Sequence, residues 1–118
     1  MADTPTELVT ASLLHVFGER DADARHAAVA AVFSADVQFR DAEGEVSGRE
    51  RREQKIAGLF ASAPGDWIFQ VRGAAQALGD VARISWSFGP PAGPAAVTGT
   101  DIAFTAEGRI TRMLTFLD

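Results

Sequence analysis

The stretch Val81-Ala82-Arg83-Ile84-Ser85-Trp86-Ser87-Phe88-Gly89 decides the class of fold. Every second residue from Ala82 to Phe88 is apolar, whereas the residues between them include Arg83 and two serines. A period of two residues is typical of a β-strand that is buried on one face. Gly79-Asp80 stands just before it and suits a two-residue hairpin turn, so we expect an antiparallel partner strand over Trp67–Leu78.

The residues that follow continue the same pattern. Pro90-Pro91-Ala92-Gly93-Pro94 is the densest group of structure breakers and predicts a loop. Two further strands are expected, over Val97–Ala106 and Arg109–Leu117, with Glu107-Gly108 as the turn between them. The second half of the chain therefore predicts an antiparallel meander.

The first half of the chain has the spacing of helices instead. Thr4-Pro5-Thr6-Glu7 has the form of a capping box with proline at the first helical position. Apolar residues then recur at near-helical spacing as far as Phe17, and Gly18 is the expected end of this helix. A second helix is predicted over Asp21–Phe33, with one of its first aspartates as the cap.

A short strand, Val37–Arg40, and a third helix complete the first half. Ser47-Gly48-Arg49-Glu50 has the form of a second capping box, and its helix is predicted to run to about Ser62. This order predicts an α+β fold, a cone-shaped roll with three N-terminal helices packed on a curved, mainly antiparallel sheet. We expect one domain over residues 1–118, with a ligand cavity between sheet and helices.

Composition excludes several classes of function. The 118 residues contain no cysteine and only two histidines, so we expect no disulfide, no thiolate nucleophile, no metal site and no cofactor. The net charge of −5 argues against a general nucleic-acid binder. No apolar run is long enough to span a bilayer, and the N-terminal residues lack the pattern of a signal peptide. A cytoplasmic protein with no membrane partner is the expectation.

Three stretches carry a resemblance to a known family. They are Ala31-Val32-Phe33-Ser34-Ala35-Asp36-Val37-Gln38-Phe39-Arg40-Asp41, Ser47-Gly48-Arg49, and Thr98-Gly99-Thr100-Asp101-Ile102-Ala103-Phe104 followed by Gly108-Arg109-Ile110. With the order of elements, they resemble the nuclear-transport-factor-2-like superfamily, closest to its SnoaL-like and ketosteroid-isomerase-like branches. The resemblance covers nearly the whole chain. It implies the fold more strongly than an activity, because this fold hosts isomerases, cyclases, dehydratases, hydrolases and non-catalytic modules.

The resemblance also implies two site residues. Asp41 falls where ketosteroid isomerases place the general base, and Asp101 falls where they place a protonated acid that donates a hydrogen bond to the developing oxyanion. Those isomerases take a second donor from a tyrosine on the first helix, but this chain contains no tyrosine. His15 lies on the matching turn and is the candidate for that donor if it points inward.

Each of these residues has a simpler interpretation. Asp41 begins an ordinary turn sequence, Asp41-Ala42-Glu43-Gly44. Asp101 sits in mid-strand, where aspartate is disfavoured, yet it would be unremarkable if it faced outward and paired with Arg83 or Arg112. His15 would be structural if it lay half-exposed on its helix.

Aromatic residues are the expected walls of the cavity, although any one of them can belong to the core instead. The predicted pocket residues are Phe17, Phe39, Phe60, Trp86 and Phe88. The charged run Arg49–Lys55 is interpreted as a solvated helix face, with Arg49 and Glu53 spaced for an ion pair. Its alternative is a site that attracts an anion.

Two functions remain open at this point. One is an acid–base enzyme acting on a small hydrophobic carbonyl compound or epoxide, with Asp41 as base, Asp101 as donor and His15 as a possible third member. The other is a non-catalytic binding or dimerisation module of the same fold. A homodimer through the sheet is also expected, because apolar residues such as Ile102 and Phe104 alternate with Ala103, and one cavity can bury only one face.

Overall fold

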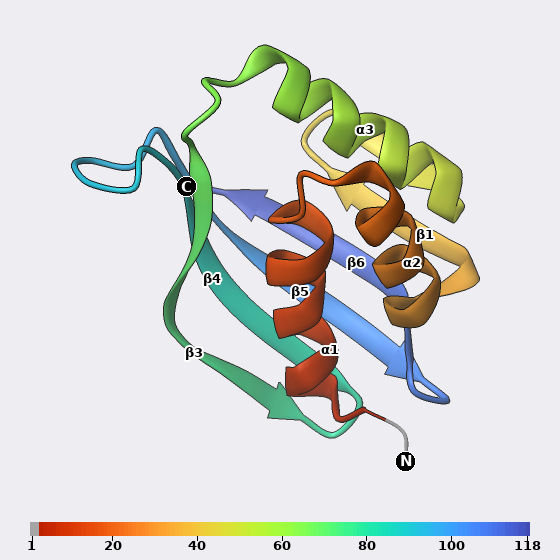
Figure 1. The fold of residues 1–118 in the computed structure, drawn as a ribbon. Coiled ribbons are helices and arrows are strands. Elements are labelled where there is room, and N and C mark those ends of the chain that lie inside the picture. Colours follow the sequence, from red (N-terminus) through yellow and green to blue (C-terminus); the bar gives the residue numbers. More distant parts are fainter. Residues whose placement is uncertain (1–2) are drawn as a thin grey trace.

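The computed structural model describes residues 3–118, so the first two residues of the predicted domain lie outside the described residues (Figure 1). It confirms an α+β architecture. The helical elements are α1 (Pro5–Ala11), the π-helical turn η1 (Ser12–Phe17) that continues it, α2 (Ala22–Val32) and α3 (Arg49–Ser62). The strands are β1 (Phe33–Asp41), β2 (Gly44–Ser47), β3 (Ile68–Leu78), β4 (Val81–Gly89), β5 (Val97–Ala106) and β6 (Arg109–Leu117).

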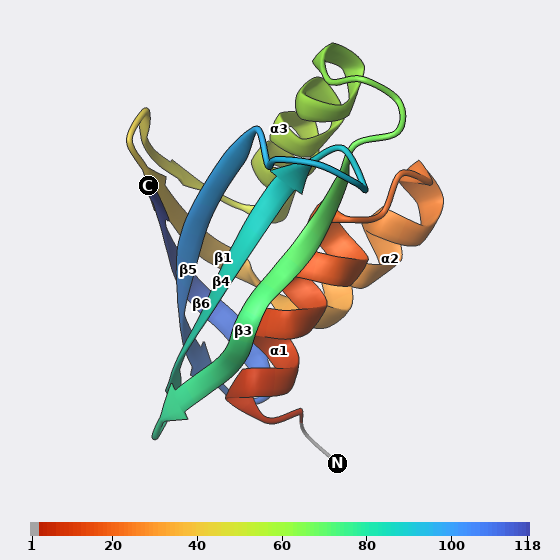
Figure 2. The same cartoon turned by 90° about the vertical axis from the view of Figure 1, so that its left-hand side faces the viewer.

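All six strands form one sheet in the order β2-β1-β6-β5-β4-β3. Every neighbouring pair is antiparallel except β1 and β6, which run parallel. The three helices lie on the same side of the sheet, which bends around them (Figure 2). Three helices on a mainly antiparallel sheet are thus confirmed, whereas the cone shape stays a prediction.

The strands of the meander begin and end almost where the sequence pattern places them. In β4, Ala82, Ile84, Trp86 and Phe88 are all buried against the helices, as the period of two residues requires. The same alternation in β5 buries Asp101 and leaves Ile102 half-exposed on the other face. This inward orientation of a carboxyl group is the feature on which the site depends.

The helix caps are partly as predicted. Thr4 and Glu7 form the capping box of α1, and Asp21 accepts a hydrogen bond from the Ala24 N–H at the start of α2. The second predicted box was wrong. Ser47 is the last residue of β2 and pairs with Gln38, so its side chain does not cap α3. Within residues 3–118 no helix is both long and apolar enough to cross a membrane.

Candidate active site

A pocket of about 260 Å³ lies between the sheet and the helices. Its walls are mainly apolar and come from η1, from α3 and from strands β3 to β6. Five ionisable side chains interrupt this apolar wall at its inner end and its rim: Asp101, Arg52, Asp41, Glu43 and Lys55. The full lining is Leu13, Phe17, Asp41, Ala42, Glu43, Arg52, Lys55, Leu59, Phe69, Trp86, Phe88, Val97, Asp101, Thr115 and Leu117.

Asp101 is the most deeply buried carboxyl group of the pocket, at 2 % exposure. Its Oδ1 atom accepts two hydrogen bonds, from the Thr115 hydroxyl at 2.8 Å and from the Trp86 indole N–H at 3.1 Å. Burial raises the pKa of Asp101, and the charge of Arg52 and these two hydrogen bonds only partly oppose that effect. The neutral acid would carry its proton on Oδ2, which forms no hydrogen bond within residues 3–118.

A glycine on the same strand holds the indole donor in place. Trp86 pairs across the sheet with Gly99, and a Cβ atom at Gly99 would lie 2.7 Å from the indole ring and 2.6 Å from the Phe116 carbonyl oxygen. Only glycine leaves room for the indole ring beside this position. The indole N–H is therefore fixed towards Asp101.

Asp41 ends β1 at the rim of the pocket, and its side chain is 20 % exposed. One carboxylate oxygen accepts the Glu43 N–H at 2.9 Å, and the other pairs with the Lys55 ammonium. Burial by itself would raise the pKa of Asp41. The hydrogen bonds from Lys55 and Glu43, and the charges of Lys55 and Arg52, outweigh that effect and lower this pKa below its ordinary value.

Arg52 brings a buried cation into the same pocket. Its guanidinium carbon lies 4.2 Å from the Phe17 ring centre and 4.1 Å from that of Phe39, which are cation–π distances. Its Nη2 atom donates to the Met113 sulfur at 3.6 Å, and its Nε–H is buried with no acceptor. Burial lowers the pKa of Arg52 to about 10, so the side chain still carries its charge at neutral pH.

The pocket thus contains two carboxyl groups whose pKa values are shifted in opposite directions. Asp41 is ionised at neutral pH and can accept a proton, whereas Asp101 is disposed to hold one. Such a pair can move a proton and stabilise the charge that this movement creates. Among residues 3–118 there is no cluster of three or more histidine, aspartate or glutamate residues that could hold a metal ion.

A sequence model of the SnoaL-like domain matches residues 10–113. The chain belongs to the SnoaL-like family. Similar solved structures include a SnoaL-like family protein from Agrobacterium tumefaciens, with 23 % identity, a TM-score of 0.85 and 97 % coverage of both chains. A proposed polyketide cyclase from Sinorhizobium meliloti has 17 % identity and a TM-score of 0.71, with coverage of 92 % of this chain and 93 % of that one.

A third solved structure extends the comparison to the neighbouring branch. It is a protein from Catenulispora acidiphila with a ketosteroid isomerase-like fold, at 24 % identity and a TM-score of 0.71, with 96 % of this chain and 85 % of that chain covered. No curated protein matches this SnoaL-like chain. These likenesses show the fold, and the resemblance to the superfamily and to both branches is confirmed.

Three predicted site residues of this SnoaL-like domain lie outside the pocket. His15 is exposed on the outer side of η1, beside Thr6, Glu7 and Thr10, so the expectation of an inward-pointing donor was wrong. Helical spacing explains this, because Leu13 and Phe17 are four residues apart and both face the pocket, whereas His15 lies midway between them and so points to the opposite side.

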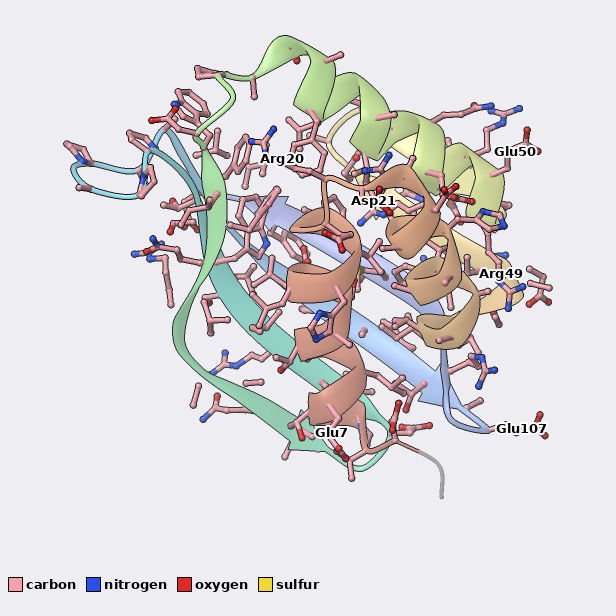
Figure 3. All side chains as sticks on the ribbon, in the orientation of Figure 1. Glu7, Arg20, Asp21, Arg49, Glu50 and Glu107 are labelled. Atoms are coloured by element: carbon pink, nitrogen blue, oxygen red, sulfur yellow. The ribbon has the colours of Figure 1, made fainter. Side chains whose placement is uncertain are left out.

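The other two misplaced residues are aromatic. Phe39 belongs to the core, where its ring packs edge-on against Phe33 at 5.0 Å. Phe60 is covered by Arg20, whose guanidinium carbon lies 4.5 Å from the ring centre. Figure 3 shows Arg20 beneath α3, and its Nη2 donates to the Trp67 carbonyl oxygen at 2.7 Å. Phe17, Trp86 and Phe88 do line the pocket, as do Asp41 and Asp101.

Arg52 is the most deeply buried charged residue among the pocket residues that the sequence interpretation of this SnoaL-like chain missed. The charged run Arg49–Lys55 predicts a solvated face, but Arg52 is buried and Arg49 donates to the Phe33 carbonyl oxygen instead of pairing with Glu53. Figure 3 shows Arg49 at the N-terminal end of α3. A signal was available, since Arg52 precedes the buried Ile56 by four residues and so shares its helix face.

The raised pKa of Asp101 gives a prediction about stability. Below its ordinary pKa of 3.8 this carboxyl is protonated in both the folded and the unfolded state, and burial costs little. As the pH rises through the raised folded-state pKa, the unfolded chain has already released its proton and the fold loses stability. Asparagine at this position does not titrate. As the pH rises, the free energy of unfolding of Asp101→Asn should therefore increase relative to that of the wild type, by at most about 1.4 kcal/mol per pH unit.

Chemical denaturation of both proteins between about pH 4 and pH 8 measures this difference. Groups that titrate in the same way in the wild type and the variant contribute equally to both free energies of unfolding and cancel in the difference. The control is Asp36→Asn, which removes an exposed carboxylate from β1. Its difference from the wild type should show no comparable trend. Parallel curves for the wild type and Asp101→Asn would mean that Asp101 has an ordinary pKa.

Proposed function

We propose that this SnoaL-like protein is an acid–base enzyme, without a cofactor, that acts on a small, largely apolar carbonyl compound or epoxide. The observation that carries the proposal is an apolar pocket that brings together Asp41, whose pKa is lowered, and Asp101, whose pKa is raised. The same fold family includes proteins described as isomerases and polyketide cyclases, which is consistent with such chemistry.

For a carbonyl substrate, the roles follow from the two environments. The Asp41 carboxylate removes a proton from the carbon next to the carbonyl, and the electron pair of that C–H bond moves to form an enolate. Asp101 donates a hydrogen bond from Oδ2 to the oxygen on which negative charge develops. Asp41 then returns the proton to carbon, so no external oxidant or reductant is needed.

The experiment is deuterium exchange at the carbon next to a ketone. Phenylacetone and cyclohexanone are suitable probes, because both are small enough for the pocket and both carry exchangeable protons. Wild-type protein in D₂O should remove the proton NMR signals of these positions faster than buffer alone. Absence of exchange above the buffer rate, for probes shown to bind, would contradict an enzyme of this type.

A non-catalytic binding module is the second candidate, and one contact favours it. The ion pair between Asp41 and Lys55 holds the would-be base and lowers its proton affinity. An enzyme would require the substrate to displace Lys55, whose side chain is 41 % exposed and free to move into solvent. Binding of the ketone probes without exchange is the result that supports the module.

The proposal includes a homodimer, in a protein that the sequence predicts to be cytoplasmic. Ile102, Leu114 and Phe116 are neighbours on β5 and β6 and lie on the face that the helices do not cover. Phe116 is 56 % exposed, and an apolar patch on a sheet is typical of an interface. Light scattering at micromolar concentration should give twice the mass of one chain, and Phe116→Lys should give a monomer. A wild-type monomer would contradict this prediction.

A further inference from the structure

Arg52 is a buried cation that uses little of its hydrogen-bonding capacity. A guanidinium group carries five N–H donors, yet within residues 3–118 its one hydrogen bond goes to the weakly accepting sulfur of Met113. Its Nε–H is buried without an acceptor, and the side chain is only 3 % exposed. Buried charges in proteins are normally paired, so this arrangement lacks a component.

The aromatic neighbours of Arg52 do not supply that component. Phe17 and Phe39 contact the guanidinium carbon through their ring faces at 4.2 and 4.1 Å. Cation–π contacts of this kind stabilise the charge and fix the position of the group, but aromatic rings are not hydrogen-bond acceptors equivalent to an oxygen. The donors therefore remain available while their position is set.

The two carboxyl groups of the pocket do not supply it either. Arg52 forms no ion pair with any residue from 3 to 118. Asp41 is already paired with Lys55, and the Oδ1 atom of Asp101 is occupied by the Trp86 and Thr115 donors. Burial lowers the pKa of Arg52 and the charges of Asp101 and Asp41 partly oppose that effect, but within residues 3–118 neither carboxyl group accepts a hydrogen bond from its guanidinium.

We infer that the pocket binds a small apolar molecule that carries one carboxylate, and that Arg52 is the residue that binds this carboxylate. The inference rests on the proposed function only in placing the ligand in this pocket. A guanidinium matches a planar carboxylate with two parallel hydrogen bonds, and the rest of the cavity of about 260 Å³ offers mostly apolar walls to the ligand body. Among the pocket residues within 3–118, Lys55 is engaged by Asp41 and Arg52 is the cation without an ion pair, and a single cation suits a carboxylate better than a doubly charged phosphate.

Calorimetric titration with phenylacetate and with phenylacetamide tests the inference. The two probes have nearly the same shape and differ in charge. Wild-type protein should bind phenylacetate about 10-fold or more tightly than the amide, as a charge-assisted pair to a buried arginine implies. In Arg52→Met the preference should fall to about 2-fold or less through weaker binding of phenylacetate, with binding of the amide little changed.

Arg51→Met is the matched control, because Arg51 is an exposed arginine on the same helix and lies outside the pocket. It makes the same change in net charge and should keep the wild-type preference. A second measurement needs no variant at all. The NMR signal of the Arg52 Nε–H in wild-type protein should shift with phenylacetate and stay in place with phenylacetamide.

Several outcomes would overturn the inference. Equal affinity of the wild type for both probes, an unchanged preference in a folded Arg52→Met, or an unmoved Nε–H signal would each remove Arg52 as the carboxylate-binding residue. If benzylphosphonate bound more tightly than phenylacetate, the natural ligand would carry a doubly charged group and not a carboxylate. Carboxylate-selective binding without deuterium exchange would instead contradict only the proposed catalysis, so the two failures are distinguishable.

Discussion

Asp41→Asn should reduce deuterium exchange of a ketone probe to about one hundredth of the wild-type rate or less. The amide oxygen of asparagine has nearly the same place in the pocket but cannot accept a proton at neutral pH. Asp101→Asn should reduce the exchange rate less, by about 10-fold. An amide N–H still donates a hydrogen bond to the developing oxyanion, although less strongly than a carboxylic acid. Rates are measured by proton NMR in D₂O with phenylacetone.

Asp36→Asn is the control for both variants. Asp36 is an exposed carboxylate on the same strand as Asp41, and its loss changes the net charge by the same amount. This variant should exchange the probe at the wild-type rate. If a folded Asp41→Asn kept more than half of that rate, the base would have to be another group.

Arg52→Met should make the fold more stable. Burial lowers the pKa of Arg52 from its ordinary value to about 10, which means that burying its charge costs about 3 kcal/mol at neutral pH. This cost is fully present below about pH 10 and is relieved only at higher pH, where the folded protein can release the proton. Contacts with Phe17 and Phe39 offset part of it, and methionine keeps contact with both rings. We expect the free energy of unfolding to rise by about 1 to 3 kcal/mol.

Urea denaturation at neutral pH measures this change. Arg51→Met, on the exposed side of the same helix, should stay within about 0.5 kcal/mol of the wild type. A loss of stability in Arg52→Met would mean that Arg52 is retained for the fold and not for a ligand. A gain would mean that the chain keeps an unfavourable charge in its pocket, as is common for binding sites.

Much of the fold could be predicted because its long strands alternate strictly. From Val81 onward, the two-residue period and the glycine-containing turns fix both the ends of the strands and the face that each residue occupies. The hairpin of β1 and β2 was not predicted in full. Its strand β2 has only four residues, so no period can be recognised, and Ser47 fits a helix cap as well as a strand end.

One residue of the site could be predicted from the residues alone because its type is out of place in its strand. Asp101 in an apolar strand is such a signal, and the structure places it in the pocket. His15 was placed wrongly because its role came from the resemblance, whereas its spacing of two residues from the inward-facing Leu13 and Phe17 puts it on the outer side of the helix. Arg52 was hidden in a charged run, where one buried arginine resembles its exposed neighbours.

The parallel pairing of β1 with β6 has a consequence for synthesis on the ribosome. It joins Phe33–Arg40 to Ile110–Leu114, so the β1–β2 hairpin has no neighbour in the sheet until the last strand has been made. Thr115 and Leu117, which complete the pocket, arrive with that same strand. The binding site therefore forms only in the final, long-range closure of the sheet, the slow step for a topology of this kind.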